Sequence, residues 1–224
     1  MSSPLFKSQA YHFLSKPEEI TSQVVELLGL RKQHGVNKKP LLVWEPFPPA
    51  CQPENLESTL NACKLVDVFS PNHLEITRLF TDVVPEDFQP EILESYAQKF
   101  LDRSIGPDGE GCVVIRAAEH GTLSASRAAG FIWSPAFYAP GSDTSRVIDP
   151  TGAGNAFIGG FTIGLQQNLT LGEAAAYGHV AASFALEQIG MPKLESYGSI
   201  EMWNGFKVEE RLEEYRARLK NAVI

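Results

Sequence analysis

The sequence contains little cysteine. Cys51, Cys63 and Cys112 are its only thiols in 224 residues, and no two of them have the C-x-x-C spacing. An odd number of thiols without paired spacing argues against a disulfide framework and against a cysteine zinc site. None of the histidines, His12, His34, His73, His120 and His179, has metal-ligand spacing with another. We therefore expect a reducing, intracellular compartment.

Long apolar runs and an excess of positive charge are also missing. The start, MSSPLFKSQAYHF, lacks the basic stretch and apolar run of a signal peptide, and AFIGGFTIGL is too short and glycine-rich to span a bilayer. Nineteen basic and 27 acidic residues give a net charge of -8, which disfavours a polyanion such as DNA. These absences predict a cytoplasmic protein without nucleic-acid or membrane partners, although a local pocket can still hold a small phosphate compound.

The first half of the chain alternates between strand and helix patterns. Strands are expected at Ala10–Leu14 and GCVVIRA, and buried strands at PLLVWEP and VDVFSPN. Helices are expected from Pro17 to near Gly35, over PENLESTLNACKL and NHLEITRLF, and from Glu91 to Leu101. This alternation predicts an α/β fold with a doubly wound, mostly parallel sheet flanked by helices.

The second half begins with short alternating segments and then becomes helical. Residues 121–138 are expected to form an antiparallel ribbon on the edge of the sheet, and Arg146–Ile148 is strand-like. Thr170 and Glu173 have the spacing of a capping box for the next helix. A last amphipathic helix has leading glutamates and trailing basic residues, and its apolar positions are Phe206, Leu212, Tyr215 and Leu219. Because no repeat or convincing linker occurs, we expect one domain over residues 1–224.

The stretch RVIDPTGAGNAFIGGF contains a tight Gly-x-Gly turn followed by a helix of small residues. Gly152 and Gly154 let the backbone approach a ligand, and the helix adds free N–H groups and the positive end of its dipole. Two other phosphate motifs do not fit, because G-x-x-x-x-G-K-[ST] is absent and Phe157 replaces the last glycine of G-x-G-x-x-G. Gly160 and Gly164 could instead serve close helix packing. Both roles are compatible, since they use different surfaces.

Four segments in order resemble one protein family. DPTGAGNAF, from Asp149 to Phe157, closely resembles the second signature of the PfkB, or ribokinase-like, carbohydrate kinases, usually D-T-T-G-A-G-D-A-F. PNHLE resembles the family's N-x-x-E motif, VVIRAAEHG its V-V-V-T-x-G-x-x-G strand and turn, and SFALEQIGMP its closing helix. WEPFPPACQPENL further resembles the fungal maintenance-of-killer branch. The resemblance covers Tyr11 to Pro192, and the family's N-terminal sugar-binding and lid region has no counterpart before Ala10.

The resemblance implies ATP and Mg²⁺ as cofactors. Gly152, Ala153 and Gly154 would form the anion hole for the transferred phosphoryl group. Asn72 and Glu75 would act on Mg²⁺ through water. Taken alone, an Asn and a Glu three residues apart are more often a helix cap and a solvated carboxylate.

Five further positions would surround the nucleotide by the same resemblance: Arg116, Ala118, Gly121, His179 and Ser183. Arg116 replaces the family's threonine and Ala118 its glycine. Arg116 could reach a phosphate, whereas an arginine in a loop is more often solvated. The histidines are more often surface or satisfied core residues. Trp44 and Glu45 end a strand at its carboxyl end, where a substrate role is possible, although packing is the commoner role of such a tryptophan.

The largest departure from the family is Asn155, which stands where the family has its catalytic aspartate. An amide cannot take a proton from the attacking sugar hydroxyl near neutral pH. Asp149 is expected to lie too far round the turn to replace it. Two hypotheses follow: a kinase with impaired phosphoryl transfer to a sugar-like hydroxyl, or a pseudokinase, which either binds nucleotide weakly or is a scaffold for contacts with a protein partner or in a homodimer.

Overall fold

The computed structural model describes residues 4–198 and 200–221, and its contacts divide the chain into two compact units. Unit 1 comprises the chain up to Ala117 together with Leu123–Ile132, and unit 2 comprises Ala118–Thr122 together with the chain from Trp133. The boundaries fall close to or inside the last two strands of the main sheet.

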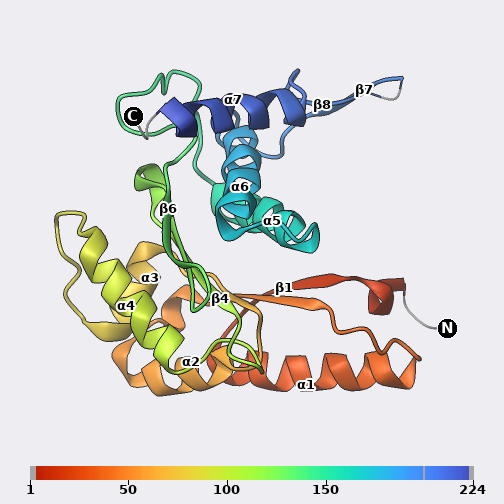
Figure 1. Ribbon diagram of the computed structural model, residues 1–224, viewed down its shortest axis with the longest axis vertical. Helices are drawn as coiled ribbons and strands as arrows, with labels where there is room; N and C mark the ends of the chain where they lie inside the picture. Colours follow the sequence, from red (N-terminus) through yellow and green to blue (C-terminus); the bar gives the residue numbers. More distant parts are fainter. Residues whose placement is uncertain (1–3, 199, 222–224) are drawn as a thin grey trace. The chain divides into compact units, whose positions relative to one another are not determined.

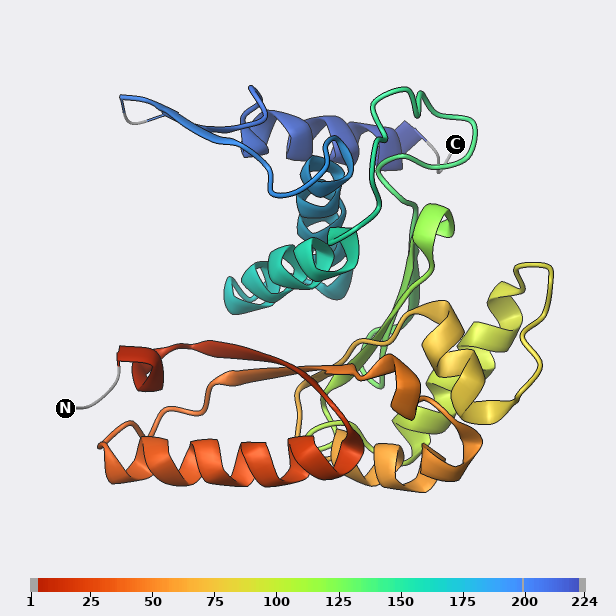
Figure 2. The ribbon, with the colours of Figure 1, turned by 180° about the vertical axis from the view of Figure 1, so that it is seen from behind.

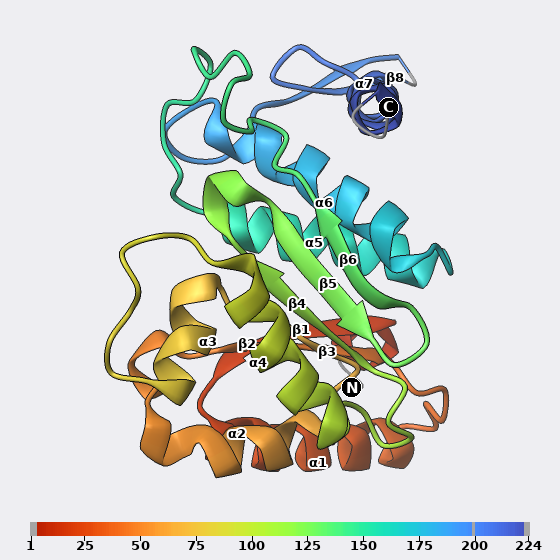
Figure 3. The same ribbon diagram turned by 60° about the vertical axis from the view of Figure 1, so that its left-hand side comes forward.

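The main sheet has six strands in the order β1-β2-β3-β4-β5-β6, which is also their order along the chain. Figure 3 shows β4, β5 and β6 side by side. Their bounds are β1 Ala10–Ser15, β2 Leu41–Pro46, β3 Val68–Phe69, β4 Cys112–Arg116, β5 Thr122–Ser126 and β6 Gly130–Ser134. Strands β1 to β4 pair in parallel. The expected mostly parallel sheet is confirmed, although β3 is shorter than its apolar pattern predicts.

Four helices connect the parallel strands of unit 1. Their bounds are α1 Pro17–Gln33, α2 Leu56–Cys63, α3 His73–Phe80 and α4 Pro90–Asp102. Parallel strands in chain order with right-handed crossovers receive their connecting helices on one face, and Figures 1 and 2 show α1 and α2 together on one face of β1 and β2. On the face toward α4, the Phe69 ring lies between those of Trp44 and Phe100, with tilted ring planes and centroid distances of 5.0 and 4.8 Å.

Unit 2 is built on the helices α5 Ala153–Gln166, α6 Leu171–Leu186 and α7 Val208–Asn221. A Cβ added to Gly164 of α5 would lie 2.6 Å from the Cα atom of Ala174 in α6. The glycines therefore let the two helices approach closely, as the packing interpretation predicts. The core against α7 contains the side chains of Phe137, Tyr138, Ala176, Val180, Phe184, Leu212 and Tyr215.

Three local features of unit 2 differ from the expectations. Arg146–Ile148 is not a strand, because the N–H groups of Ile148 and Asp149 donate to the Leu186 carbonyl at the end of α6, at 2.8 and 3.2 Å. Thr170 does cap α6 by accepting from the Glu173 N–H, but the Glu173 carboxylate pairs with Arg216 at 2.6 Å. The antiparallel hairpin of β7 Leu194–Tyr197 and β8 Ile200–Trp203 had no counterpart among the predicted elements.

The helices of the described residues are too short or too polar to cross a bilayer. The last of them, α7, has Glu209 and Glu210 in its first turn and Arg218 and Lys220 in its last turn. This charge order matches the helix dipole and confirms the expected pattern.

Candidate functional site

The turn before α5 is held open by one glycine. Gly152 caps the helix with φ +82°, a left-handed conformation that favours glycine, and a Cβ at this position would have no atom within 4 Å. Just before it, the Asp149 carboxylate accepts a hydrogen bond from the Thr151 N–H at 2.9 Å. The backbone at Gly152 is therefore both bent and unobstructed within its own unit.

The N–H groups of this turn are not all free. The Ala153 N–H donates to the Pro150 carbonyl at 3.2 Å, and the Ala156 N–H donates to the Gly152 carbonyl at 2.9 Å. The N–H groups of Gly154 and Asn155 lie in the first turn of α5, where a helix offers no intrahelical acceptor. These two groups and the helix dipole make the terminus suitable for an anion.

Neither polar side chain of the turn is suited to take up a proton. Asn155 is exposed in the first turn of α5 and carries an amide. The hydrogen bonds from Thr151, first from its backbone N–H and then from its side chain, lower the pKa of the Asp149 carboxyl below its ordinary value. A carboxylate with a lowered pKa that is bound to its own turn is a weak general base.

Asn72 and Glu75 form a complete capping box at the start of α3. The Glu75 N–H donates to Asn72 Oδ1 at 2.8 Å, and the Asn72 N–H and side-chain amide donate to the Glu75 carboxylate, each at 2.7 Å. The helix-cap alternative is therefore confirmed. The solvated-carboxylate alternative is wrong, since Glu75 is only 3% exposed. Burial raises the pKa of Glu75, against the lowering effects of the Asn72 N–H and Arg116.

Arg116 ends β4 and is nearly buried, with its side chain 11% exposed. Its Nη2 atom lies 2.7 Å from Glu45 Oε1 and 3.6 Å from Glu75 Oε2, and it donates to the Ser70 carbonyl at 3.0 Å. The solvated-arginine alternative is therefore wrong. Burial alone would raise the pKa of Glu45, but the hydrogen bond with His12 and the Arg116 charge together lower it. The neighbouring Trp44 has a packing role, since it is fully buried and donates to the Ser15 carbonyl.

The turn after β4 contains two residues with left-handed backbone. Ala118 has φ +50° and Gly121 has φ +92°. The left-handed conformation is one that glycine adopts more easily than alanine, so the family's glycine at the position of Ala118 has a physical reason. A side chain at Gly121 would collide with the backbone of Ser134 and Pro135.

His179 and Ser183 lie inside unit 2 on α6. His179 is 5% exposed, its Nε2 atom lies 3.0 Å from Thr122 Oγ1, and burial lowers its pKa to about 3, so the ring is neutral at ordinary pH. Ser183 is fully buried, donates to the Val180 carbonyl and accepts from Arg211 Nη1 at 3.1 Å. Both side chains are thus satisfied within the unit, and neither presents a surface to a ligand in this conformation.

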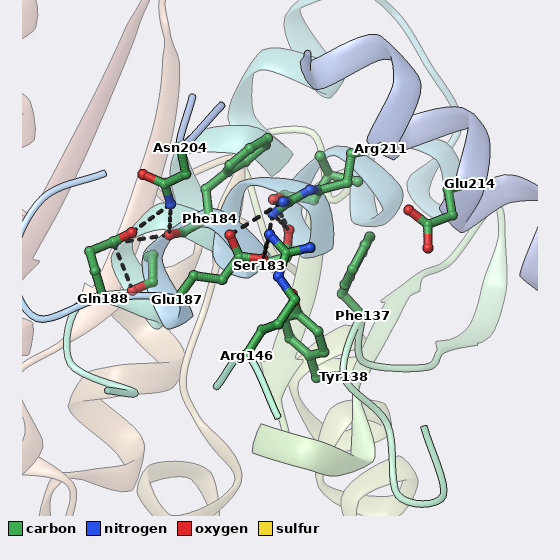
Figure 4. Close-up of polar contacts among 12 residues, drawn as sticks. Phe137, Tyr138, Arg146, Ser183, Phe184, Glu187, Gln188, Asn204, Arg211 and Glu214 are labelled. Atoms are coloured by element: carbon green, nitrogen blue, oxygen red, sulfur yellow. Dashed lines mark hydrogen bonds and ion pairs between the residues drawn. The ribbon is translucent and has the colours of Figure 1, made fainter. Parts of the chain in front are cut away.

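Arg211 of α7 was not anticipated from the sequence, because nothing distinguishes it from the other charges of that helix. It is 3% exposed, and its guanidinium lies 3.9 Å from the ring centre of Phe184 and 3.1 Å from Glu187 Oε1 (Figure 4). Arg146 pairs with the same Glu187 oxygen at 3.1 Å. This arrangement joins α7 to the end of α6.

A cavity of about 570 Å³ lies beside this arrangement, bordered by residues of the Arg146 segment, the end of α6 and the loop around Asn204. Its polar groups bind one another: Arg146 pairs with Glu187, and the Asn204 amide donates to the Gln188 side chain and the Phe184 carbonyl. The cavity therefore offers few free polar groups to a ligand.

The predicted site residues thus fall into two groups. Unit 1 brings together Asn72, Glu75 and Arg116, and it adds Glu45 and His12. Unit 2 contains the turn of α5 together with Ala118, Gly121, His179 and Ser183. Among the described residues, no group of three or more acidic, histidine or cysteine side chains could hold a metal ion by itself. A hydrated cation, which needs few protein ligands, is the kind that Asn72 and Glu75 would suit.

Comparison with known proteins identifies the family. The model of the pfkB family carbohydrate kinases matches residues 4–194. The chain is 32% identical over 222 residues to the uncharacterized protein C16C9.01c of Schizosaccharomyces pombe, with 94% of this chain and 60% of that protein covered. It is 29% identical to protein MAK32 of Saccharomyces cerevisiae, with 92% and 56% covered, in agreement with the resemblance to a fungal branch.

A solved structure gives the same fold. Ribokinase from Thermotoga maritima superposes with a TM-score of 0.56 at 20% identity, covering 92% of this chain and 56% of the ribokinase chain. The chain thus spans between half and two thirds of the length of the relatives it matches. Because the family model covers most of the sequence, the chain belongs to the PfkB family of carbohydrate kinases.

Proposed function

We propose that this chain carries the nucleotide and phosphoryl-transfer part of a PfkB-type kinase site, in which the transfer step is impaired. The substrates would be ATP with Mg²⁺ and a hydroxyl group of a sugar or sugar-like compound. One observation carries the proposal: at the start of α5 an unobstructed left-handed Gly152 is followed by an exposed Asn155 at the base position.

The triphosphate would bind at the turn of α5. Gly152, Ala153 and Gly154 shape the anion hole, with the Gly154 and Asn155 N–H groups as the free donors. Preorganised N–H donors of this kind stabilise charge that develops on a transferred phosphoryl group. Mg²⁺, when bound with ATP, neutralises phosphate charge, and Asn72 and Glu75 would orient its water ligands.

The nucleoside would lie along the turn of Ala118 and Gly121. His179 supports this turn indirectly, because its ring is hydrogen-bonded to Thr122, the residue after Gly121. Ser183 supports the neighbouring helix through its bond with Arg211. We therefore assign His179 and Ser183 to the nucleotide site as supporting residues beneath its surface.

The acceptor hydroxyl would lack a base. Asn155 can orient the hydroxyl but cannot deprotonate it. Loss of a general base typically costs about 10²- to 10⁴-fold in rate. Phosphoryl transfer would therefore be slow, while nucleotide binding, which needs only the turn and the cation, would be retained.

The test compares wild type, Asn155→Asp and Asn155→Ala. Thermal stabilisation by Mg-ATP measures binding, and release of ADP with a panel of sugars and cyclic polyols measures transfer. We expect similar stabilisation in all three proteins and a rate increase on the order of 100-fold or more only in Asn155→Asp. Gly154→Val, which crowds the anion hole, should lose the stabilisation. Transfer by the wild type as fast as by Asn155→Asp would contradict the impairment.

A pseudokinase is the second candidate, and the exposed amide at the base position favours it too. It predicts stabilisation by Mg-ATP without transfer in either wild type or Asn155→Asp, because more than the base would be missing. A role as a scaffold for a protein partner or a second copy would then remain. Absence of any ATP-dependent stabilisation would refute nucleotide binding in both forms.

A further inference from the structure

Four charged or titratable side chains of unit 1, His12, Glu45, Arg116 and Glu75, form a connected group that we call the charged row. In the parallel register Val43 lies opposite His12 and Val68, and Val68 lies opposite Cys112. Because side chains alternate between faces, Glu45 and Arg116, two and four residues further along β2 and β4, share the face of His12. The Trp44 and Phe69 rings occupy the opposite face.

The contacts in the charged row are continuous. His12 Nε2 lies 3.1 Å from Glu45 Oε2, and Arg116 Nη2 lies 2.7 Å from Glu45 Oε1 and 3.6 Å from Glu75 Oε2. Glu75 then bonds to both amide groups of Asn72 at 2.7 Å. Arg116 is thus close to two carboxylates, of which only that of Glu45 lies within hydrogen-bond distance.

The three central side chains of the charged row are nearly buried. The side chains of Glu45, Glu75 and Arg116 are 9%, 5% and 11% exposed. A buried guanidinium needs a carboxylate partner, since an unpaired buried charge is strongly destabilising. If Glu45 did not neutralise Arg116, the nearest remaining carboxylate would be Glu75, and closing the 3.6 Å gap would draw Glu75 away from its Asn72 partners.

We propose that Glu45 and Arg116 are positioning residues for the Asn72–Glu75 capping box: by neutralising Arg116, Glu45 leaves the Glu75 carboxylate on the two Asn72 amide groups. The inference rests on the proposed function only where it concerns Mg-ATP. There it adds that the cation site depends on two residues outside the N-x-x-E motif, and that Arg116 acts through Glu75 without touching the nucleotide.

The test uses Glu45→Gln, Arg116→Met, Arg116→Lys and the double variant Arg116→Met/Glu45→Gln. The first readout, without ligand, is hydrogen exchange of the Asn72 N–H, which donates to Glu75. The control is the Leu42 N–H of the same unit, which donates to an Asp67 carboxylate oxygen at 2.8 Å, outside the charged row. We expect Glu45→Gln to speed exchange at Asn72 by about tenfold more than at Leu42, because Arg116 then captures Glu75.

The other variants sharpen the result. The double variant has no guanidinium to capture Glu75. Its exchange rate at the Asn72 N–H, corrected by that of the Leu42 N–H, should therefore be lower than in Glu45→Gln. Arg116→Lys keeps a buried cation for Glu45 and should remain near wild type. Arg116→Met serves if Glu45→Gln does not fold. In Arg116→Met the cation is absent, so the Glu45 and Glu75 charges repel each other. Relative to wild type, exchange should therefore again be accelerated more at the Asn72 N–H than at the Leu42 N–H. Equal acceleration at both amides in Glu45→Gln and Arg116→Met would overturn the proposal, since it would indicate general loss of stability.

The second readout is the Mg²⁺ concentration that gives half of the ATP-induced stabilisation. Partners of metal-site residues typically contribute 10- to 100-fold to metal affinity, so Glu45→Gln should raise this concentration by on the order of tenfold, and the double variant by less. Selective exchange at Asn72 without ATP stabilisation in any protein would refute the proposed function but support the positioning role. Stabilisation by ATP together with equal acceleration of exchange at both amides would support the proposed nucleotide binding but refute the positioning role.

Discussion

The two units hold their predicted site residues in opposite ways. In unit 1, Glu75 is 3% exposed and belongs to a row of paired, nearly buried charges. In unit 2, Asn155 is exposed and Gly152 has open space above it. In the first arrangement, replacing one charged residue should strongly destabilise the fold, because its buried partner is then left unpaired. In the second, the exposed side chain of Asn155 should tolerate substitution at little cost to the fold.

The largest effect is expected in the charged row. Arg116→Met leaves Glu45 buried without its cation and should lower the free energy of unfolding of unit 1 by about 3–5 kcal/mol. Urea unfolding followed by Trp44 fluorescence, in a background with Trp133 and Trp203 replaced by Phe, would measure it. Arg116→Met/Glu45→Gln should recover part of the loss. A loss below about 1 kcal/mol, as for a surface ion pair, would contradict the prediction.

An intermediate effect is expected where α5 packs on α6. Gly164→Ala would force a Cβ within 2.6 Å of the Ala174 Cα atom and should cost about 1–3 kcal/mol. Gly159→Ala is the matched control in the same helix. Its added Cβ meets nothing within 4 Å, and it should stabilise by about 0.5–1 kcal/mol. Chemical unfolding measures the change in the free energy of unfolding in each variant. Changes of the same sign in the two variants would refute the close-packing role of Gly164.

A smaller, pH-dependent effect is expected from His179. Burial lowers its pKa to about 3, so between pH 6.5 and 3 the unfolded chain takes up a proton that the folded unit does not. This residue should therefore lower the free energy of unfolding by up to about 1.4 kcal/mol for each pH unit below 6.5. Between pH 7 and pH 5.5 the free energy of unfolding should therefore fall less in His179→Gln than in the wild type, as chemical unfolding at the two pH values would measure. An identical fall in the two proteins would show that His179 takes up a proton in the folded unit as readily as in the unfolded chain.

The smallest effect is expected at the turn of α5. Asn155→Asp places a negative charge in the first turn of a helix and should stabilise by about 0.3–1 kcal/mol at low ionic strength. The gain should shrink as salt is added, because the charge is exposed. Thermal unfolding at low and high salt measures it. If Asn155→Asp instead lost stability at low salt, the electrostatic potential at this turn would not be the positive one of a free helix N-terminus.

Much of unit 1 could be predicted from the sequence because its signals are local. The apolar run PLLVWEP and the segment GCVVIRA occur as the parallel strands β2 and β4. Asn72 and Glu75 have the spacing of a capping box, and the structure contains one. These patterns depend on neighbours along the chain, which is why a single sequence is enough to predict them.

The contacts that decide the character of the site are not local. Arg116 looked like a loop residue because its partners Glu45 and Glu75 come from another strand and from a helix, and only the register of the sheet brings them together. Arg211 is one of several charges in α7, and its burial against Phe184 depends on how α7 packs on α6. Side-chain pairing across elements follows from tertiary packing, which no spacing rule contains.

The path of the chain between the units has a consequence for experiments on fragments. Unit 2 includes the short segment Ala118–Thr122, which is separated from the rest of that unit by ten residues of unit 1, Leu123–Ile132. A truncated protein beginning at Trp133 would therefore lack Thr122, and the buried ring of His179 would lose its hydrogen bond with that residue. Expressing unit 2 alone calls for residues 118–122 to be rejoined through a short designed turn, and cleavage in the 127–129 turn should leave both units able to stay folded.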